Sequence, residues 1–173
     1  MKIFIKKFLT KKSFTLIEIL VVATIITLLA SGGAVVYTQL NRASRDAKRK
    51  ADLEQIRLAL ELFRDEVGRY PLSQFFYNFC NENENRWPNH SLYKKYLRKP
   101  PKDPKCPDYT YSYAPTKSDG SECQNLINPP DYSTWCQDYT LGAYLEGENS
   151  TCPISINCGS ATCNYCVGPL GQK

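Results

Sequence analysis

One long apolar run near the amino terminus constrains this chain more than any other feature. Between Ile17 and Val36 the residues are apolar or small, apart from two threonines and a single charged side chain, Glu18. About 20 consecutive apolar residues are enough for a helix to cross a lipid bilayer. A basic stretch without acidic residues precedes the run, and basic residues there favour a cytoplasmic leader. The sequence therefore predicts a single-pass membrane segment after Lys2, Lys6, Lys7, Lys11 and Lys12.

Glu18 is the most informative residue of this segment. A carboxylate near the start of a membrane helix is costly unless it is paired. An ordinary secretory signal has a shorter apolar core, and a plain signal anchor leaves the glutamate unexplained. If the chain is cut between Ser13 and Phe14, the new α-amino group lies one helical turn from Glu18. The carboxylate could then pair with its own amino terminus or with that of a neighbouring subunit. The alternative is that it only snorkels to the membrane surface.

The cysteines indicate on which side of the membrane the rest of the chain lies. All eight lie between residues 80 and 166, in a region rich in Gly, Asn and Ser: Cys80, Cys106, Cys123, Cys136, Cys152, Cys158, Cys163 and Cys166. An even number behind a membrane segment favours disulfides in an oxidising compartment. Cys163 and Cys166 form a C-x-x-C pattern, which could also be half of a zinc site or a redox motif. We favour disulfides, whose pairing cannot be deduced from spacing.

A second helical pattern follows the membrane segment directly. No Pro or Gly occurs between Asn41 and Val67. One face repeats at steps of three and four, as in an amphipathic helix, and small residues extend it toward the membrane. Gly68 and Pro71 predict its end. We therefore expect one continuous helix from about Phe14 to Val67. Its apolar face is made by Leu53, Ile56, Leu60, Phe63 and Val67, and a narrow stripe of small residues toward the membrane is made by Ala43, Ala47 and Ala51.

The remaining sequence predicts a small α+β headpiece. Tyr109–Tyr113 alternates at period two and Tyr139–Leu145 does so more weakly, as expected for strands. Ser91–Leu97 is a candidate short helix, and Pro100–Pro104 a rigid, extended linker. Strands packed on one helix give an α+β fold. The expected order is a leader (1–13), the membrane half of the helix (14–37), its amphipathic half (38–67), an antiparallel-sheet headpiece (68–146) and an irregular, cysteine-rich tail (147–173).

The charge distribution argues against a nucleic-acid partner for the headpiece. The formal net charge is +5, but the five leader lysines account for all of it. A second basic cluster at 42–50 is offset only by Asp46, and from Ala51 onward acidic residues outnumber basic ones. We interpret the 42–50 cluster as a solvated charge run or a contact with anionic lipid headgroups. No aromatic residues interleave with it, as a nucleic-acid site would require.

Catalytic patterns are missing from the sequence. The single histidine, His90, lies in a polar stretch with no nucleophile that the sequence can place beside it. There is also no glycine-rich phosphate loop, so we assign no catalytic residue and expect no enzyme activity.

The segment KKSFTLIEILVV closely resembles the amino-terminal signal of type IV prepilins and type II secretion pseudopilins. Four further segments resemble successive landmarks of the major pseudopilin family: ALELFRDEVGRYP, YLRKPPKDP, YTYSYAP and YTLGAYLE. The resemblance is strong over 11–71, moderate over 96–115 and weak over 139–146. Nothing after Gly147 matches.

This resemblance implies a processing and assembly pathway. A prepilin peptidase would cut between Ser13 and Phe14 and N-methylate Phe14, and Glu18 would direct assembly. The implied partners are copies of the chain and related pilins in a helical fibre, an inner-membrane assembly platform and membrane lipid. The implied location is a bacterial membrane, with a cytoplasmic leader and an extracytoplasmic headpiece, and then the fibre. Two departures from the family are Ser13, where glycine is usual, and Gly32-Gly33 in place of a late proline.

The family also carries a calcium site in a Leu-Gly-Ala-Asp-Gly pattern near its last strands. Here Leu141-Gly142-Ala143 is followed by Tyr144 and Leu145, so the aspartate is missing. We therefore predict no metal and no cofactor; Glu146 and Glu148 are the remaining candidate calcium ligands.

The favoured function is a structural subunit of a type IV pilus-like fibre or a type II secretion pseudopilus. A minor pilin acting as an adhesin or a DNA-uptake tip protein is one alternative. A signal-anchored extracytoplasmic enzyme is the other. The amphipathic helix continuous with the membrane segment favours the two pilin hypotheses.

Overall fold

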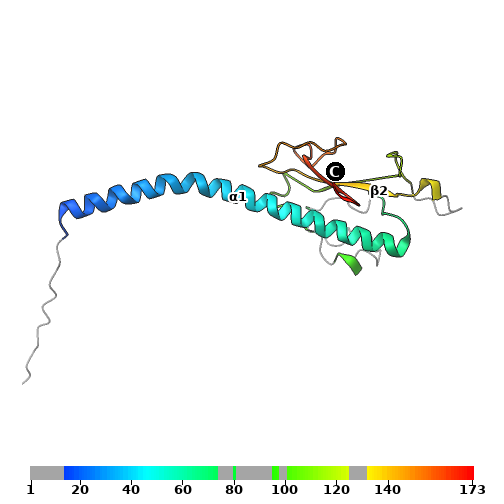
Figure 1. The fold of residues 1–173 in the computed structure, drawn as a ribbon, viewed down its shortest axis with the longest axis horizontal. Helices are drawn as coiled ribbons and strands as arrows, with labels where there is room; N and C mark the ends of the chain where they lie inside the picture. The colour runs from blue at the N-terminus through cyan, green and yellow to red at the C-terminus, as the bar shows by residue number, and fades with distance from the viewer. Residues whose placement is uncertain (1–13, 74–79, 81–94, 98–100, 125–131) are drawn as a thin grey trace, which may run out of the picture. The chain divides into compact units, whose positions relative to one another are not determined.

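The computed structural model of the chain describes residues 14–73, 80, 95–97, 101–124 and 132–173. The chain divides into two compact units, Met1–Asn41 and Arg42–Lys173, which are described separately below. Helix α1, Leu16–Val67, contributes to both units and is coloured blue to green in Figure 1.

The first unit contains the apolar part of α1. Among the described residues, α1 is the one helix long and apolar enough to cross a membrane. Its hydroxyl groups bond within the helix: Thr24 Oγ1 donates to the carbonyl of Val21 at 2.8 Å, and Ser31 Oγ to that of Leu28 at 2.9 Å. These bonds satisfy the polar side chains inside the helix, which is what an apolar solvent requires.

The second unit begins with the amphipathic half of α1, which ends where the sequence predicts. Val67 is the last helical residue, and Gly68 follows with a φ of 80°. The Gly68 N–H donates to the Arg64 carbonyl at 2.7 Å. A left-handed glycine that closes the last turn in this way is a common helix terminator, because it has no Cβ to clash.

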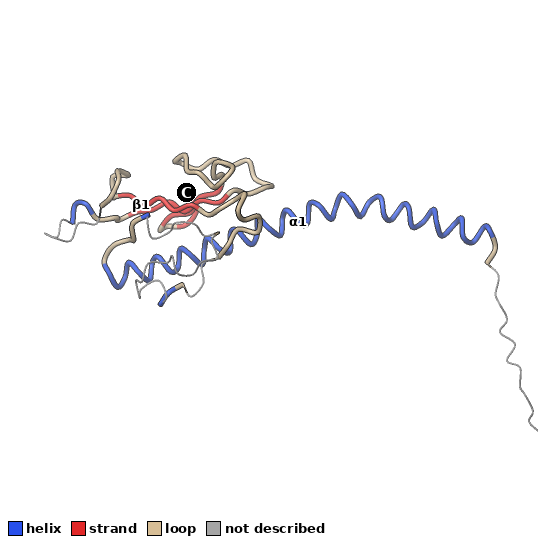
Figure 2. The backbone as a smooth tube through the Cα atoms, turned by 180° about the vertical axis from the view of Figure 1, so that it is seen from behind, coloured by secondary structure: helices blue, strands red, loops and turns tan. Residues whose placement is uncertain are grey.

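Within the described residues, four antiparallel strands form one sheet in the order β1-β2-β3-β4. Figures 1 and 2 show these strands along one side of helix segment 42–67. A short 3-10 helix, Tyr132–Thr134, precedes β2. The strands are β1 Ser112–Thr116, β2 Asp138–Ala143, β3 Tyr165–Gly168 and β4 Gly171–Gln172.

Helix α1 and the sheet share one hydrophobic core. Leu53, Ile56 and Leu60 are at most 2% exposed and lie in one buried cluster with Tyr139 and Leu141 of β2. This confirms the central part of the predicted helix face. Phe63 and Val67, at the carboxyl-terminal end of that face, are half-buried, and the small residues Ala43, Ala47 and Ala51 are exposed. Toward the amino terminus the buried face continues instead through Asp46 and Arg49.

The opposite face of β2 is covered by the tail. Successive strand residues point to opposite faces, so Gly142 faces away from Leu141 and the helix. A Cβ at Gly142 would lie 2.6 Å from Ile156 Cδ1 and 2.7 Å from Cys163 Sγ. The tail therefore packs directly on the glycine backbone, and only a residue without a side chain allows this approach.

Several element boundaries differ from the sequence-based expectations. The predicted strand Tyr109–Tyr113 is observed at Ser112–Thr116, because β2 offers partners only from Ser112 onward and Tyr109 pairs separately with Gly159. The second predicted strand is observed at Asp138–Ala143. The tail, expected to be irregular, supplies β3 and β4. Of the candidate helix at 91–97, residues 91–94 lie outside the described residues, while 95 and 96 are helical.

Candidate functional site

Thr15 and Glu18 form a capping box at the start of α1. The Thr15 N–H and Oγ1 both donate to Glu18 Oε2, at 3.0 and 2.9 Å. The Glu18 N–H approaches Thr15 Oγ1 at 3.4 Å in return. Such reciprocal bonds satisfy backbone donors that the first helical turn leaves without partners. The Glu18 carboxylate is therefore held at the amino-terminal end of the helix.

The capping box also determines where the helix begins. Leu16 is the first helical residue, so Phe14 and Thr15 precede the helix, and Phe14 is 75% exposed. Ser13 lies outside the described residues. Phe14 is thus presented on non-helical backbone, two residues ahead of α1.

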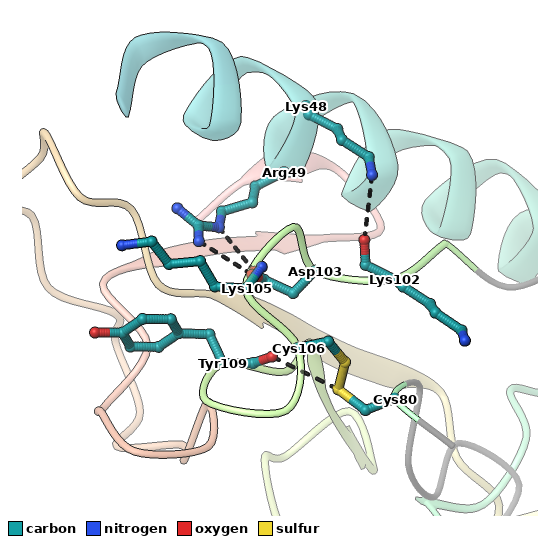
Figure 3. Close-up of a disulfide and its surroundings, with 8 residues drawn as sticks. All are labelled: Lys48, Arg49, Cys80, Lys102, Asp103, Lys105, Cys106 and Tyr109. Atoms are coloured by element: carbon teal, nitrogen blue, oxygen red, sulfur yellow. Dashed lines mark hydrogen bonds and ion pairs between the residues drawn. A yellow bond between two sulfur atoms is a disulfide. The ribbon is translucent and has the colours of Figure 1, made fainter. Parts of the chain in front are cut away.

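A buried arginine connects the amphipathic half of α1 to the headpiece. The Arg49 side chain is 0% exposed and binds Asp103 through two parallel bonds, Nε to Oδ2 at 2.7 Å and Nη2 to Oδ1 at 3.0 Å. Figure 3 shows Arg49 reaching from the helix to the loop that carries Asp103 and the Cys80–Cys106 disulfide. Asp103 is itself positioned by its own turn, because its Oδ1 accepts from the Lys105 N–H at 2.8 Å.

Glu146, which follows β2, is the second focus of this network. Arg45 binds it through two bonds of 2.7 and 2.6 Å. Lys105 Nζ lies 2.8 Å from Glu146 Oε2, and Arg49 Nη1 lies 3.0 Å from Oε1. Asp46 completes the cluster by binding Arg49 at 2.8 Å. Three cations and three carboxylates therefore balance within the charge network formed by Arg45, Asp46, Arg49, Asp103, Lys105 and Glu146.

Asp46 also holds the backbone that follows β2. Its two carboxylate oxygens accept from the N–H groups of Glu146 and Gly147, each at 2.9 Å. A helix residue thus replaces the strand partner that this backbone lacks beyond Ala143. Lys50, one turn further along α1, binds Glu148.

These contacts correct our interpretation of the basic cluster at 42–50. Arg49 is buried, Arg45 is partly buried, and Lys50 pairs with Glu148, so these three residues hold the fold together instead of forming a solvated or lipid-facing charge run. Arg42 and Lys48 remain exposed. The partners of the buried cations lie at least 54 residues away in sequence, apart from Asp46.

Two carboxylates, the partly buried Glu146 and the buried Asp52, have pKa values shifted in opposite directions. Hydrogen bonds from Arg45, Lys105 and Arg49 outweigh partial burial and lower the pKa of Glu146 far below its usual range. Burial raises the pKa of Asp52, although the Tyr111 hydroxyl donates to its Oδ2 at 2.7 Å and acts in the opposite direction. Glu146 is therefore stabilised as an anion, whereas Asp52 is not.

The comparisons with known families decide the identity of the chain. The family described as type II secretion system (T2SS), protein G, matches residues 36–125, about half of the chain. The prokaryotic N-terminal methylation motif matches residues 10–34. This chain belongs to the protein G family of the type II secretion system. No curated protein and no solved structure matches it significantly.

Members of this family are major pseudopilins. The pseudopilin is accordingly a structural subunit and not an enzyme; it is processed by prepilin peptidase and passes from the membrane into a fibre. The family match includes Arg45, Arg49 and Asp103 but ends before Glu146. Of the six residues of the charge network, Glu146 alone thus lies in a part of this pseudopilin that the family match does not cover.

All eight cysteines of the pseudopilin are paired in disulfides. The bonds are Cys80–Cys106, Cys123–Cys136, Cys152–Cys166 and Cys158–Cys163. Cys163 and Cys166 of the C-x-x-C pattern belong to different disulfides, so in the structure the pattern is neither half of a zinc site nor a redox pair. Within the described ranges no group of three or more candidate ligands could hold a metal ion.

The calcium site that the resemblance implies does not fit these residues. Tyr144 occupies the position of the family aspartate, and its ring stacks on Tyr109 with centroids 4.8 Å apart. The two nearby carboxylates are already neutralised, Glu146 by three cations and Glu148 by Lys50. A calcium ion needs several oxygen ligands, and Glu146 and Glu148, the two carboxylates that follow Tyr144 in sequence, both bind cationic side chains instead.

Sequence reasoning missed Thr15 and the charge network. The four residues Thr15-Leu16-Ile17-Glu18 match the capping-box pattern, which was a usable signal for Thr15. For Arg49, Asp103 and Glu146 the local sequence holds no such signal, because their pairing depends on the tertiary fold.

Proposed function

We propose that this pseudopilin is made as a precursor, cut between Ser13 and Phe14 on the cytoplasmic side, and N-methylated on Phe14. The headpiece then lies outside the cytoplasm, and an inner-membrane assembly platform adds the subunit to a helical pseudopilus. Glu18 pairs there with the amino terminus of the adjacent copy. This ion pair stabilises one axial position of neighbouring helices relative to all other positions.

The capping box carries this proposal. The Glu18 carboxylate is bound by Thr15, the residue after Phe14, and so lies near the position of the new amino group. It accepts from two donors of its own chain in the isolated subunit. An ammonium group of a neighbour would be a stronger, charge-assisted partner than these neutral donors. Assembly therefore exchanges an internal bond of Glu18 for an intermolecular one.

Two variants and one mass measurement test the proposal. Intact-mass spectrometry of membrane-extracted protein should find a chain that starts at N-methylated Phe14. Glu18→Ala should still insert in the membrane and be cut, but it should be absent from sheared fibres. Glu18→Gln keeps the size and loses the charge, so it should behave like Glu18→Ala. Recovery of uncut precursor in cells with an active prepilin peptidase would contradict the processing step, and normal fibres from Glu18→Ala would contradict the pairing.

A further inference from the structure

Asn164 lies inside the C-x-x-C pattern, and its side chain binds the backbone of the loop 145–148 that follows β2. Asn164 Oδ1 accepts from the Leu145 N–H at 2.6 Å, and Nδ2 donates to the Leu145 carbonyl at 2.9 Å. The same Nδ2 donates to the Glu148 carbonyl at 2.8 Å. The Asn164 N–H itself donates to the Ala143 carbonyl at 3.1 Å. One side chain of the tail therefore holds both ends of this loop.

The middle of the loop is held from the helix. Asp46 accepts from the N–H groups of Glu146 and Gly147, each at 2.9 Å. Each of the four loop residues thus has a backbone group bound to the side chain of either Asn164 or Asp46. Side chains of the same chain therefore supply the bonds that fix a loop outside the sheet, where backbone polar groups otherwise lack partners.

Two disulfides fix the position of Asn164. Cys158–Cys163 ends at the residue directly before it, and Cys152–Cys166 ends two residues after it. Cys163 and Cys166 are at most 3% exposed. A side chain can hold a loop in one place only when its own backbone is restricted by its surroundings. The C-x-x-C pattern provides this restriction on both sides of the asparagine, without zinc binding or redox chemistry.

The bonds of Asn164 also use the oxygen atoms that a cation would need. Backbone carbonyls are common ligands of calcium, and in this loop the carbonyls of Leu145 and Glu148 both accept from Nδ2. We propose that Asn164, bracketed by the two disulfides, is this chain's internal substitute for a metal ion in loop 145–148, and that the C-x-x-C pattern serves to position it. This role belongs to the folded subunit and is independent of the assembly proposed above.

Two variants of the purified full-length protein test the role of the amide. Asn164→Ala removes all three side-chain bonds, whereas Asn164→Asp keeps the shape but has no hydrogens to donate at neutral pH. Each should lower the unfolding temperature by about 5 °C or more. Asn157→Ala is the matched control, because Asn157 is an exposed asparagine of the same tail, and it should unfold like the parent. A parent-like unfolding temperature of Asn164→Asp would overturn the proposal, because the two donated bonds would then not hold the loop.

Hydrogen exchange in the loop distinguishes the asparagine from a metal ion. Asn164→Ala should accelerate exchange of the Leu145 amide about tenfold, because its acceptor is lost. Addition of calcium to the parent should leave both this exchange and the unfolding temperature unchanged. Slower exchange or a higher unfolding temperature of the parent with calcium would overturn the proposal, because the loop carbonyls would then be available to an ion.

A double-mutant cycle tests whether the disulfide acts through the asparagine. Cys158→Ala/Cys163→Ala should accelerate exchange of the Leu145 amide in the parent background. The same change should add little in the Asn164→Ala background, because residues that act through one contact are not additive. Equal acceleration in the two backgrounds would overturn the positioning role of the C-x-x-C pattern, because the disulfide would then support the loop without Asn164.

Discussion

The guanidinium of Arg49 and the carboxylate of Asp103 form a two-bonded ion pair across 54 residues of sequence, with side chains 0% and 1% exposed. Arg49 therefore depends on its partners in the headpiece, because an arginine without compensating charges would be very costly in this position. The pair ties the helix to the proline-rich segment 101–104, which carries Asp103. The charge of Arg49 can therefore be buried only when the helix lies in its correct position on the sheet.

Replacing Arg49 should destabilise the headpiece strongly. Arg49→Met leaves Asp103 buried without its cation and removes one cation from Asp46 and Glu146, so the free energy of unfolding should fall by about 3–5 kcal/mol. Lys48→Met is the control, since Lys48 is exposed, forms no ion pair with a described residue and makes only a long bond of 3.5 Å to the Lys102 carbonyl, and it should change stability by less than about 0.5 kcal/mol. Thermal unfolding of the purified full-length proteins measures both. Equal unfolding temperatures of Arg49→Met and the parent would refute a stabilising role for the network.

Acid should weaken the headpiece through Glu146. Its pKa is lowered in the folded state, and an ordinary glutamate titrates near 4.3 in the unfolded chain. The unfolded state therefore takes up a proton first, so this contribution is full above about pH 5 and declines as pH falls. Glu146→Gln should be less stable than the parent at pH 7 and should lose less stability between pH 5 and pH 3.

Asp52→Asn provides the opposite-sign control for this pH dependence. The pKa of Asp52 is raised in the folded state by burial, so its ionisation opposes folding as pH rises. This variant should lose as much stability as the parent, or more, between pH 5 and pH 3. Unfolding curves in denaturant at several pH values measure these differences. If Glu146→Gln and the parent lose stability in parallel, Glu146 does not control the acid response.

The capping box should be measurable at the first turn of α1. Thr15→Val keeps the shape of the side chain and removes the hydroxyl that bonds Glu18, which should cost about 1 kcal/mol of local helix stability. Amide hydrogen exchange in the first helical turn should then accelerate about fivefold. Thr15→Ser retains the hydroxyl and should exchange like the parent. Unchanged exchange in Thr15→Val would show that Thr15 does not stabilise the helix start.

Metal removal should not affect the headpiece. A chelator should leave the unfolding temperature unchanged, because Glu146 and Glu148, which follow Tyr144, are paired with cations. Loss of stability on chelation would contradict a metal-independent headpiece.

Removal of a disulfide should destabilise the headpiece. Replacing both Cys152 and Cys166 with serine removes a disulfide that spans 14 residues, and this should lower the free energy of unfolding by about 3 kcal/mol. A thiol assay on the denatured parent should detect no free cysteine.

The features that the sequence predicts correctly are those with a local cause. The repeat of Leu53, Ile56 and Leu60 identifies the buried helix face, and Gly68 identifies the helix end, because period and backbone freedom are properties of neighbouring residues. Strand positions are shifted by up to three residues, since pairing partners and not alternation decide where a strand begins. The strand Tyr165–Gly168 was missed because it is short and begins within a C-x-x-C pattern.

The charge network could not be predicted, although every member was visible as a charged residue. Arg45 and Arg49 look like a solvated cluster from their neighbours alone. Only the fold brings Glu146 within hydrogen-bonding distance, 101 residues after Arg45. Residues that act across such separations leave no periodic pattern in a single sequence.

The sequence separation of these contacts also determines the order in which they can form while the chain is being synthesised. The four disulfides join cysteines 26, 13, 14 and 5 residues apart, so each can close soon after its own short segment has been made. Arg45 finds Glu146 only 101 residues later, so the Cys80–Cys106 and Cys123–Cys136 disulfides can form before the helix has this partner. The other two disulfides use cysteines that follow Glu146, and Cys166 lies in β3 itself. An unfinished subunit can therefore hold two of its four disulfides while its buried helix face is still uncovered, and only the last two disulfides mark a chain long enough to close the helix against the sheet.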